Sequence, residues 1–203
     1  GQLPYNFQKA SILTYVIYLI ARPVTQLYST PEKSPITSWA YSILGQIYVV
    51  LPLALLGVWG YKSDYQLFMN TEYLLMALFV FVWTNDTGAY IVGCTLGKHR
   101  LFERISPKKS WEGFFGGLAF CIILASLANY IIPGMLSTAQ WIGMGILTSI
   151  FSTWGDLCES LLKRTAGVKD SGKILPGHGG ILDRFDSELI ASPVIFIYLT
   201  FVL

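Results

Sequence analysis

The stretch "FSTWGDLCESLLKR", residues 151–164, ends a long apolar segment and carries polar groups within it. At helical spacing its polar side chains form one stripe: Ser152, Asp156, Glu159, Ser160 and Lys163. A carboxylate at the centre of a membrane helix costs about 2.5–3.5 kcal/mol on insertion scales, so Asp156 requires a partner. It lies about 10 Å before Lys163 at about 1.5 Å per residue. The stripe predicts either a metal or substrate site at the membrane boundary or an Asp–Lys pair that joins helices.

The chain as a whole is apolar, because 53% of its 203 residues are hydrophobic and only 13% are charged. This composition excludes an ordinary soluble domain. Segments long enough to cross a bilayer as helices are found at 8–28, 38–60, 73–95, 113–132, 139–162 and 187–203. The sequence therefore predicts an all-α fold, a polytopic integral membrane helical bundle with about six transmembrane helices of about 20 residues each.

We expect a single integral membrane domain over residues 1–203, because no repeat or flexible linker divides the chain. Its catalytic part is expected over roughly 73–203. The chain starts without Met, so we expect that N-terminal helices are missing. Cys94, Cys121 and Cys158 lie in apolar segments without C-x-x-C spacing, which predicts packing residues rather than a zinc site or disulfides.

The basic residues gather on one side of the predicted bundle. They fall in the first loop and in the long loops after the third and fifth segments, and only Lys9 and Lys62 are left for the other side. Lys and Arg accumulate in cytoplasmic loops. The two long basic loops are therefore expected to face the cytoplasm, where soluble anionic substrates would bind.

The third apolar segment carries the polar stretch "NDTGAYIVG", residues 85–93. At helical spacing Asp86 and Tyr90 share a face with two glycines, Gly93 and Gly97. A carboxylate and a phenol beside two residues without side chains would suit a binding or catalytic site. Small residues at this spacing, however, also permit close helix packing. Both interpretations of the glycines stay open.

The most polar stretch of the chain is "KDSGKILPGHGGILDRFDSE", residues 169–188. The overlapping segment "GVKDSGKI", residues 167–174, nearly matches a phosphate-binding P-loop, but Ile174 replaces the magnesium-binding hydroxyl and a membrane helix precedes it, which excludes a P-loop. A glycine-rich backbone could still cradle phosphates with cationic partners at Lys163, Arg164, Lys169 and Lys173.

Two carboxylates, Asp183 and Asp186, stand three residues apart where the last helix begins. The helix dipole alone favours acidic residues there. If the two helix ends meet, Asp156 joins them in a carboxylate group of the kind that holds Mg²⁺ beside phosphates. Buried carboxylates next to basic, glycine-rich loops suit phosphoryl or nucleotidyl transfer, which depends on positioning and charge neutralisation.

The stretch "SLLKRTAGVKDSGKILPGHGGILDRFDS", residues 160–187, resembles the signature of the phosphatidate cytidylyltransferases, also called CDP-diacylglycerol synthases. Its S-x-x-K-R, K-D, H-G-G and D-R-x-D elements occur in order. "NDTGAYIVG" and "ISPKKSWEGFFGG", residues 105–117, look like other segments of the bacterial form of this family. The resemblance covers roughly 48–200, whereas the N-terminal part matches nothing diagnostic.

The resemblance implies an enzyme of the bacterial inner membrane, with its active site facing the cytoplasm, that condenses CTP with phosphatidic acid to CDP-diacylglycerol and pyrophosphate. It implies Mg²⁺, with a second cation left open, and a homodimer; no nucleic acid partner is expected. The implied metal ligands and catalytic residues are Asp156, Asp183 and Asp186, with Lys163 as a further catalytic residue. The implied phosphate and nucleotide contacts are Arg164, Lys169, Asp170, His178, Gly179 and Gly180. Further substrate contacts are expected from Ser106, Lys108, Lys109 and Asp86.

The implied reaction needs no strong general base, because the phosphate monoester of phosphatidic acid is already a nucleophilic anion. His178 is therefore assigned to binding, with turn capping as the alternative. The depth of Asp156 predicts a polar cavity open to both cytoplasm and lipid. Two other functions stay open: a CTP-dependent polyprenol or phytol kinase, which would release CDP, and a membrane transporter, which would move its substrate across vesicles.

Overall fold

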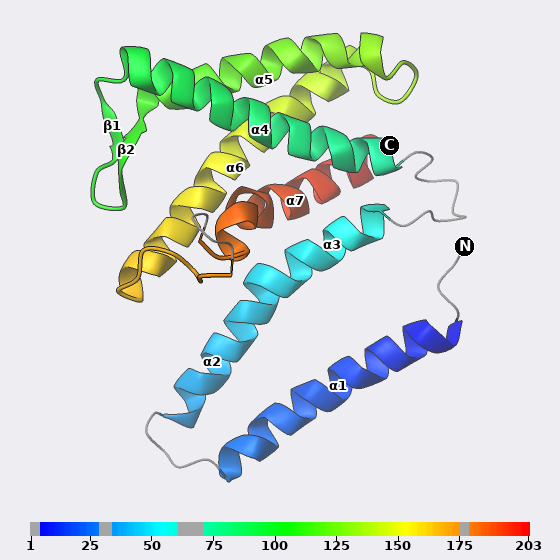
Figure 1. Cartoon of the computed structure of the whole chain (residues 1–203). Coiled ribbons are helices and arrows are strands. Elements are labelled where there is room, and N and C mark those ends of the chain that lie inside the picture. The colour runs from blue at the N-terminus through cyan, green and yellow to red at the C-terminus, as the bar shows by residue number, and fades with distance from the viewer. Residues whose placement is uncertain (1–4, 29–33, 61–70, 175–178) are drawn as a thin grey trace. The chain divides into compact units, whose positions relative to one another are not determined.

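The computed structural model describes residues 5–28, 34–60, 71–174 and 179–203 (Figure 1). It divides into two compact units, Gly1–Thr71 and Glu72–Leu203, each described here by itself. Every predicted apolar segment forms helix, and the all-α fold class is confirmed. The second unit begins next to the predicted start of the catalytic part, whose catalytic role stays a prediction.

In the first unit, the residues that the structure describes form two apolar helical segments. One is α1, Tyr5–Leu27, and the other runs without interruption through α2, Pro35–Gly45, the π-helical turn η1, Gln46–Val50, and α3, Leu51–Gly60. Pro35 stands in the first turn of α2, where its missing N–H is no loss. Arg22 of α1 donates to the hydroxyls of Ser38 and Ser42, each at 3.1 Å, so polar contacts join the two segments.

The described residues of the second unit form four long helices and one β-hairpin. In chain order they are α4, Thr71–Leu96; β1, Arg100–Phe102; β2, Ser106–Ser110; α5, Trp111–Ile131; α6, Thr138–Thr165; and α7, Leu182–Val202. Figure 1 shows the hairpin at the end of the α4–α5 pair and α6 crossing between that pair and α7. The antiparallel hairpin pairs Arg100 with Ser110 and Phe102 with Ser106, and the sequence did not predict it.

Within the part of the chain that the structure describes, four helical segments are long and apolar enough to cross a membrane: Pro35–Gly57, Glu72–Leu96, Trp111–Ile131 and Leu182–Val202. The chain is therefore a membrane protein with several crossing helices. The predicted segments 8–28 and 139–162 also form helices, α1 and α6, but membrane crossing by these two stays a prediction. The polar stripe of α6 lowers its hydropathy. The last helix begins at Leu182, as expected from Asp183 and Asp186 at its start, and its polar first turn precedes the apolar segment 187–203.

Glycines allow the helices of the second unit to approach closely. A Cβ at Gly117 of α5 would lie 2.5 Å from Oδ1 of Asn85 on α4. A Cβ at Gly155 of α6 would lie 2.6 Å from the backbone oxygen of Asp186 on α7. Only glycine fits at such approaches without displacing backbone. The first approach brings α5 close to α4, and the second brings α6 close to α7 beside the polar stripe.

Local capping sets where α5 and α6 begin. The Ser110 hydroxyl accepts from the backbone N–H of Gly113 at 3.1 Å and caps α5. Ser137 and Gln140 form a reciprocal capping box at the start of α6. Lys163 and Arg164 occupy the last turn of α6, where cations complement the helix dipole. The caps keep the hairpin and the polar stripe at fixed positions along their helices.

Candidate functional site

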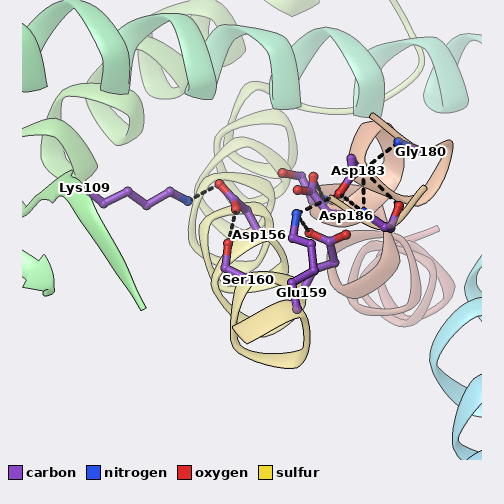
Figure 2. A network of polar contacts seen from close by, with 10 residues as sticks. Lys109, Asp156, Glu159, Ser160, Gly180, Asp183 and Asp186 are labelled. Atoms are coloured by element: carbon purple, nitrogen blue, oxygen red, sulfur yellow. Dashed lines mark hydrogen bonds and ion pairs between the residues drawn. The ribbon is translucent and has the colours of Figure 1, made fainter. Parts of the chain in front are cut away.

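Lys109 of β2 reaches Asp156 of α6 across the second unit. Its Nζ lies 2.5 Å from Oδ2 of Asp156, and the other carboxylate oxygen accepts from the Ser160 hydroxyl at 3.2 Å (Figure 2). The side chain of Asp156 is 33% exposed, so it is not sealed inside a helix interface. The partner that the sequence required for Asp156 is thus Lys109, and not Lys163, the lysine on its own helix.

Lys163 lies between two carboxylates near the end of α6. It pairs with Glu159 one turn earlier, and its Nζ donates to Oδ1 of Asp183 at 2.8 Å. All three side chains are largely buried, with exposures of 16% for Lys163, 1% for Glu159 and 8% for Asp183. Lys163 stands beyond the predicted span 139–162. Burial alone lowers the pKa of its ammonium, but hydrogen bonds to Asp183 and Glu159 outweigh this and raise that pKa above the ordinary lysine value.

Asp183 closes the glycine-rich loop onto the start of α7. Its carboxylate accepts from the backbone N–H and the hydroxyl of Ser171, both at 2.9 Å, and from the backbone N–H of Gly180 at 2.7 Å. Gly179 adopts a φ of 81°, a left-handed conformation that favours glycine. Asp183 therefore holds the loop and Lys163 together, and its further role as a metal ligand stays a prediction.

Four carboxylates gather where α4, α6 and α7 meet. Asp156 interacts electrostatically with both Asp86 and Asp186, and Glu188 with Asp86 and Asp186. Glu188 is only 3% exposed, and its Oε2 accepts no hydrogen bond from any described residue. Oxygen ligands of this kind suit Mg²⁺. Among the described residues, however, no three His, Cys, Asp or Glu side chains already stand as a group able to hold a metal ion.

Asn85 fixes α4 against α6 next to Asp86. Its side chain is almost fully buried; it accepts from the Ser149 hydroxyl at 2.6 Å and donates to the hydroxyls of Ser152 and Thr153 at 3.2 and 3.3 Å. Buried amides that are fully hydrogen-bonded specify one arrangement of their helices. The Asn85 contacts therefore set the position of Asp86 relative to the stripe of α6.

A cavity of about 550 Å³ lies between α4, the hairpin, α5 and α6. Asp86 and Asp156 line it, as do Lys108, Lys109 and Arg100. The sequence left two interpretations open for Gly93 and Gly97: close helix packing or a functional site. The structure supports both interpretations. Each glycine lines the cavity, and the Gly93 Cα faces Gly113 of α5. A polar cavity at Asp156 agrees with the predicted one, and its opening toward both cytoplasm and lipid stays a prediction.

The hairpin that carries Lys109 is anchored to the start of α5. His99 Nδ1 lies 2.5 Å from Oε1 of Glu112, and the Glu112 carboxylate also accepts from the backbone N–H groups of Lys98 and His99. The backbone N–H of Trp111 donates to the carbonyl of His99 at 2.9 Å. These bonds hold both ends of the hairpin in place and so aim Lys109 at Asp156.

The structure places the predicted site residues in three ways. It brings together Asp86, Lys109, Asp156, Lys163, Asp183, Asp186 and Gly180. It leaves Lys108, Arg164, Lys169 and Asp170 exposed, and Ser106 half-buried at the start of β2. His178 lies outside the described residues. For the thiols, the packing interpretation fits the buried Cys121 but not the exposed Cys94.

Sequence reasoning missed several residues of this site. They are Asn85, Arg100 and Glu188, and Glu159 was placed in the polar stripe without a role of its own. The i,i+4 spacing to Lys163 was a signal for Glu159, and the polar amide inside an apolar helix was one for Asn85. Arg100 depends on the unpredicted hairpin, and Glu188 could not be told from an ordinary acid near a helix start.

Comparison with known proteins adds a family to this geometry. The sequence model of the Cytidylyltransferase family matches residues 2–202, nearly the whole chain. The chain belongs to this family. Membership extends over the N-terminal unit as well, which the sequence motifs alone did not reach.

The curated relatives of this family member include proteins from staphylococci. It is 41% identical over 160 residues to the phosphatidate cytidylyltransferase of Staphylococcus aureus (strain COL), covering 78% of this chain and 61% of the relative. It is 41% identical over 159 residues to the protein of that name from Staphylococcus haemolyticus (strain JCSC1435), and 40% to that from Staphylococcus epidermidis (strain ATCC 12228 / FDA PCI 1200), with the same coverage. The chain thus spans 61% of the length of the curated relatives it matches.

Proposed function

We propose that this chain acts in cytidylyl transfer from CTP to phosphatidic acid, giving CDP-diacylglycerol and pyrophosphate. The observation that carries the proposal is the family match over residues 2–202. The names of the staphylococcal relatives support the same substrates. The contacts around Asp156 and Lys163 support a site for anionic phosphates at the end of membrane helices. No observation favours the kinase or the transporter.

In the proposed reaction a phosphate oxygen of phosphatidic acid attacks the α-phosphorus of CTP. A new P–O bond forms, the bond from the α-phosphorus to the bridging oxygen breaks, and pyrophosphate leaves with the electron pair. Catalysis then rests on alignment and on neutralising the growing charge of the leaving group. Lys163, with its raised pKa, stays protonated throughout the neutral range and can serve this purpose.

The loop between α6 and α7 is assigned to the triphosphate and the nucleotide. Its proposed contacts are Arg164, Lys169, Asp170, His178, Gly179 and Gly180. The exposed positions of Arg164 and Lys169 leave their charges available to a soluble anion. Asp183 ties the two described ends of this loop together, because its carboxylate accepts from the backbone N–H groups of Ser171 and Gly180.

Mg²⁺ is part of the proposal. Asp156 and Asp186 would hold it, with Asp183 as the third predicted ligand, and it would neutralise the triphosphate oxygens. The donor chemistry fits a hard cation, and a cation here would also partner the buried Oε2 of Glu188, which accepts no hydrogen bond from the described residues. Asp183 is at present engaged by Lys163, so its ligation would require a rearrangement.

The proposed location is the bacterial inner membrane, with the site on the cytoplasmic side. The support is the distribution of basic residues, because the loops that carry the site are the ones rich in Lys and Arg. The relatives come from bacteria. A homodimer is part of the proposal on the family resemblance alone.

The test is product analysis with the purified, detergent-solubilised chain, CTP, Mg²⁺ and phosphatidic acid. Mass spectrometry should identify CDP-diacylglycerol, with pyrophosphate released in equal amount. Release of CDP together with a phosphorylated alcohol would instead identify the kinase. Substrate flux into sealed vesicles without pyrophosphate would identify the transporter, and either result would overturn the proposal.

A further inference from the structure

The cavity between α4, the hairpin, α5 and α6 has a mixed wall. Ala89, Leu101 and Phe114 supply apolar surface, and Tyr90, whose side chain also lines it, is 72% exposed. Its size of about 550 Å³ lies within the range of small-molecule sites, about 300–1,000 Å³. An apolar wall with a few charged groups suits an amphipathic ligand better than a free ion.

The cavity lies between two helices that are apolar enough to cross the membrane. Its α4 residues come from the last turns of Glu72–Leu96, and its α5 residues come from the first turn of Trp111–Ile131. It therefore stands at the membrane boundary, where a lipid headgroup can enter sideways from its own leaflet while its chains stay in the hydrocarbon.

Cationic side chains of the hairpin line the same cavity. Arg100 and Lys108 are exposed, and within the part of the chain that the structure describes neither forms an ion pair. Lys109, in contrast, is paired with Asp156. Two uncommitted cations beside an apolar wall complement a phosphate that is attached to a lipid.

We infer that this cavity holds the phosphomonoester headgroup of the membrane lipid, with Arg100 and Lys108 as its phosphate ligands. The inference rests on the proposed function and assigns its two substrates to different sides of the site. Asp156 is the boundary, because it lines this cavity and also interacts with Asp186 at the start of α7. The lipid phosphate occupies the hairpin side, and the nucleotide triphosphate occupies the side of the α6–α7 loop.

Cys94 offers a direct probe, because it is exposed and lines the cavity, whereas Cys121 is buried. In a Cys158→Ser background, alkylation of Cys94 by a maleimide would be timed in detergent. Short-chain phosphatidic acid at about ten times its Kd should slow the reaction about tenfold, by simple occupancy. Phosphatidylcholine of the same chain length, inorganic phosphate and CTP should leave the rate unchanged.

Variants test the assigned ligands. Arg100→Gln and Lys108→Gln should each weaken the protection by phosphatidic acid about tenfold and raise its KM by a similar factor, with the KM for CTP unchanged. Arg104→Gln and Lys98→Gln are matched controls, because both residues are exposed cations next to the same strands but outside the cavity wall. Both controls should behave as the parent chain does.

Several outcomes would overturn the inference. Protection of Cys94 by CTP and not by phosphatidic acid would make the cavity the nucleotide site. Equal protection by phosphatidylcholine would show that the phosphomonoester is not recognised, and equal protection by inorganic phosphate would show that the lipid is not required. The alkylation assay needs no turnover. Absence of CDP-diacylglycerol would therefore refute the proposed function, while the protection of Cys94 could still be interpreted by itself.

Discussion

Replacing Lys163 by Met should destabilise the protein strongly. The substitution leaves the Glu159 carboxylate, only 1% exposed, without its cation, whereas Asp183 keeps its hydrogen bonds from Ser171 and Gly180. Removing one member of a buried ion pair costs about 3–5 kcal/mol, because the other charge stays buried and uncompensated. At about 2–4 °C per kcal/mol for a chain of this size, the Tm should fall by about 10 °C.

The assay is thermal unfolding in detergent, followed by tryptophan fluorescence. The matched partner is the double variant Lys163→Met with Glu159→Gln, which removes the stranded charge and should recover most of the lost Tm. Arg104→Gln, at an exposed position, controls for loss of a positive charge alone. A Tm for Lys163→Met equal to that of Arg104→Gln, or a double variant no more stable than the single one, would refute the reasoning.

Three further predictions concern the site. Asp156→Asn and Asp186→Asn should each abolish Mg²⁺-dependent CDP-lipid formation with little loss of folded protein, and near-normal activity in both would remove them from the metal centre. Gly155→Ala should lower the Tm and the activity together, because its Cβ would lie 2.6 Å from the α7 backbone, whereas Gly45→Ala has open space and should do neither. Lys169→Ala should raise the KM for CTP about tenfold with unchanged Tm, and an unchanged KM would assign this lysine to the membrane surface.

Hydropathy predicted the helices because a membrane helix requires a long, continuous run of apolar residues, which is visible in the sequence itself. It failed at the edges for physical reasons. The first turn of α7 carries polar residues, among them Asp183, whose carboxylate accepts a hydrogen bond from the preceding loop. Hydropathy alone therefore does not mark this turn as part of a helix. The hairpin is short and depends on the His99–Glu112 contact and the α5 cap, which join residues that no periodic pattern links.

The site was predictable where its contacts are local or its motif is distinctive. The stripe of α6 predicted that Asp156 needs a partner, yet two lysines were available, and only the fold selects Lys109 over Lys163. The Lys163–Asp183 contact spans two helices and so depends on how α6 packs against α7. The close approach at Gly155 that permits this packing has no signature beyond a single glycine.

The central claim is that the α-phosphorus of CTP moves to the lipid. Incubation of the purified chain with phosphatidic acid, Mg²⁺ and CTP that is radiolabelled at either the α- or the γ-phosphorus tests it directly. The account predicts that the α-label enters the lipid fraction as CDP-diacylglycerol and that the γ-label is released as pyrophosphate. Entry of the γ-label into the lipid, with the α-label left in CDP, would contradict it.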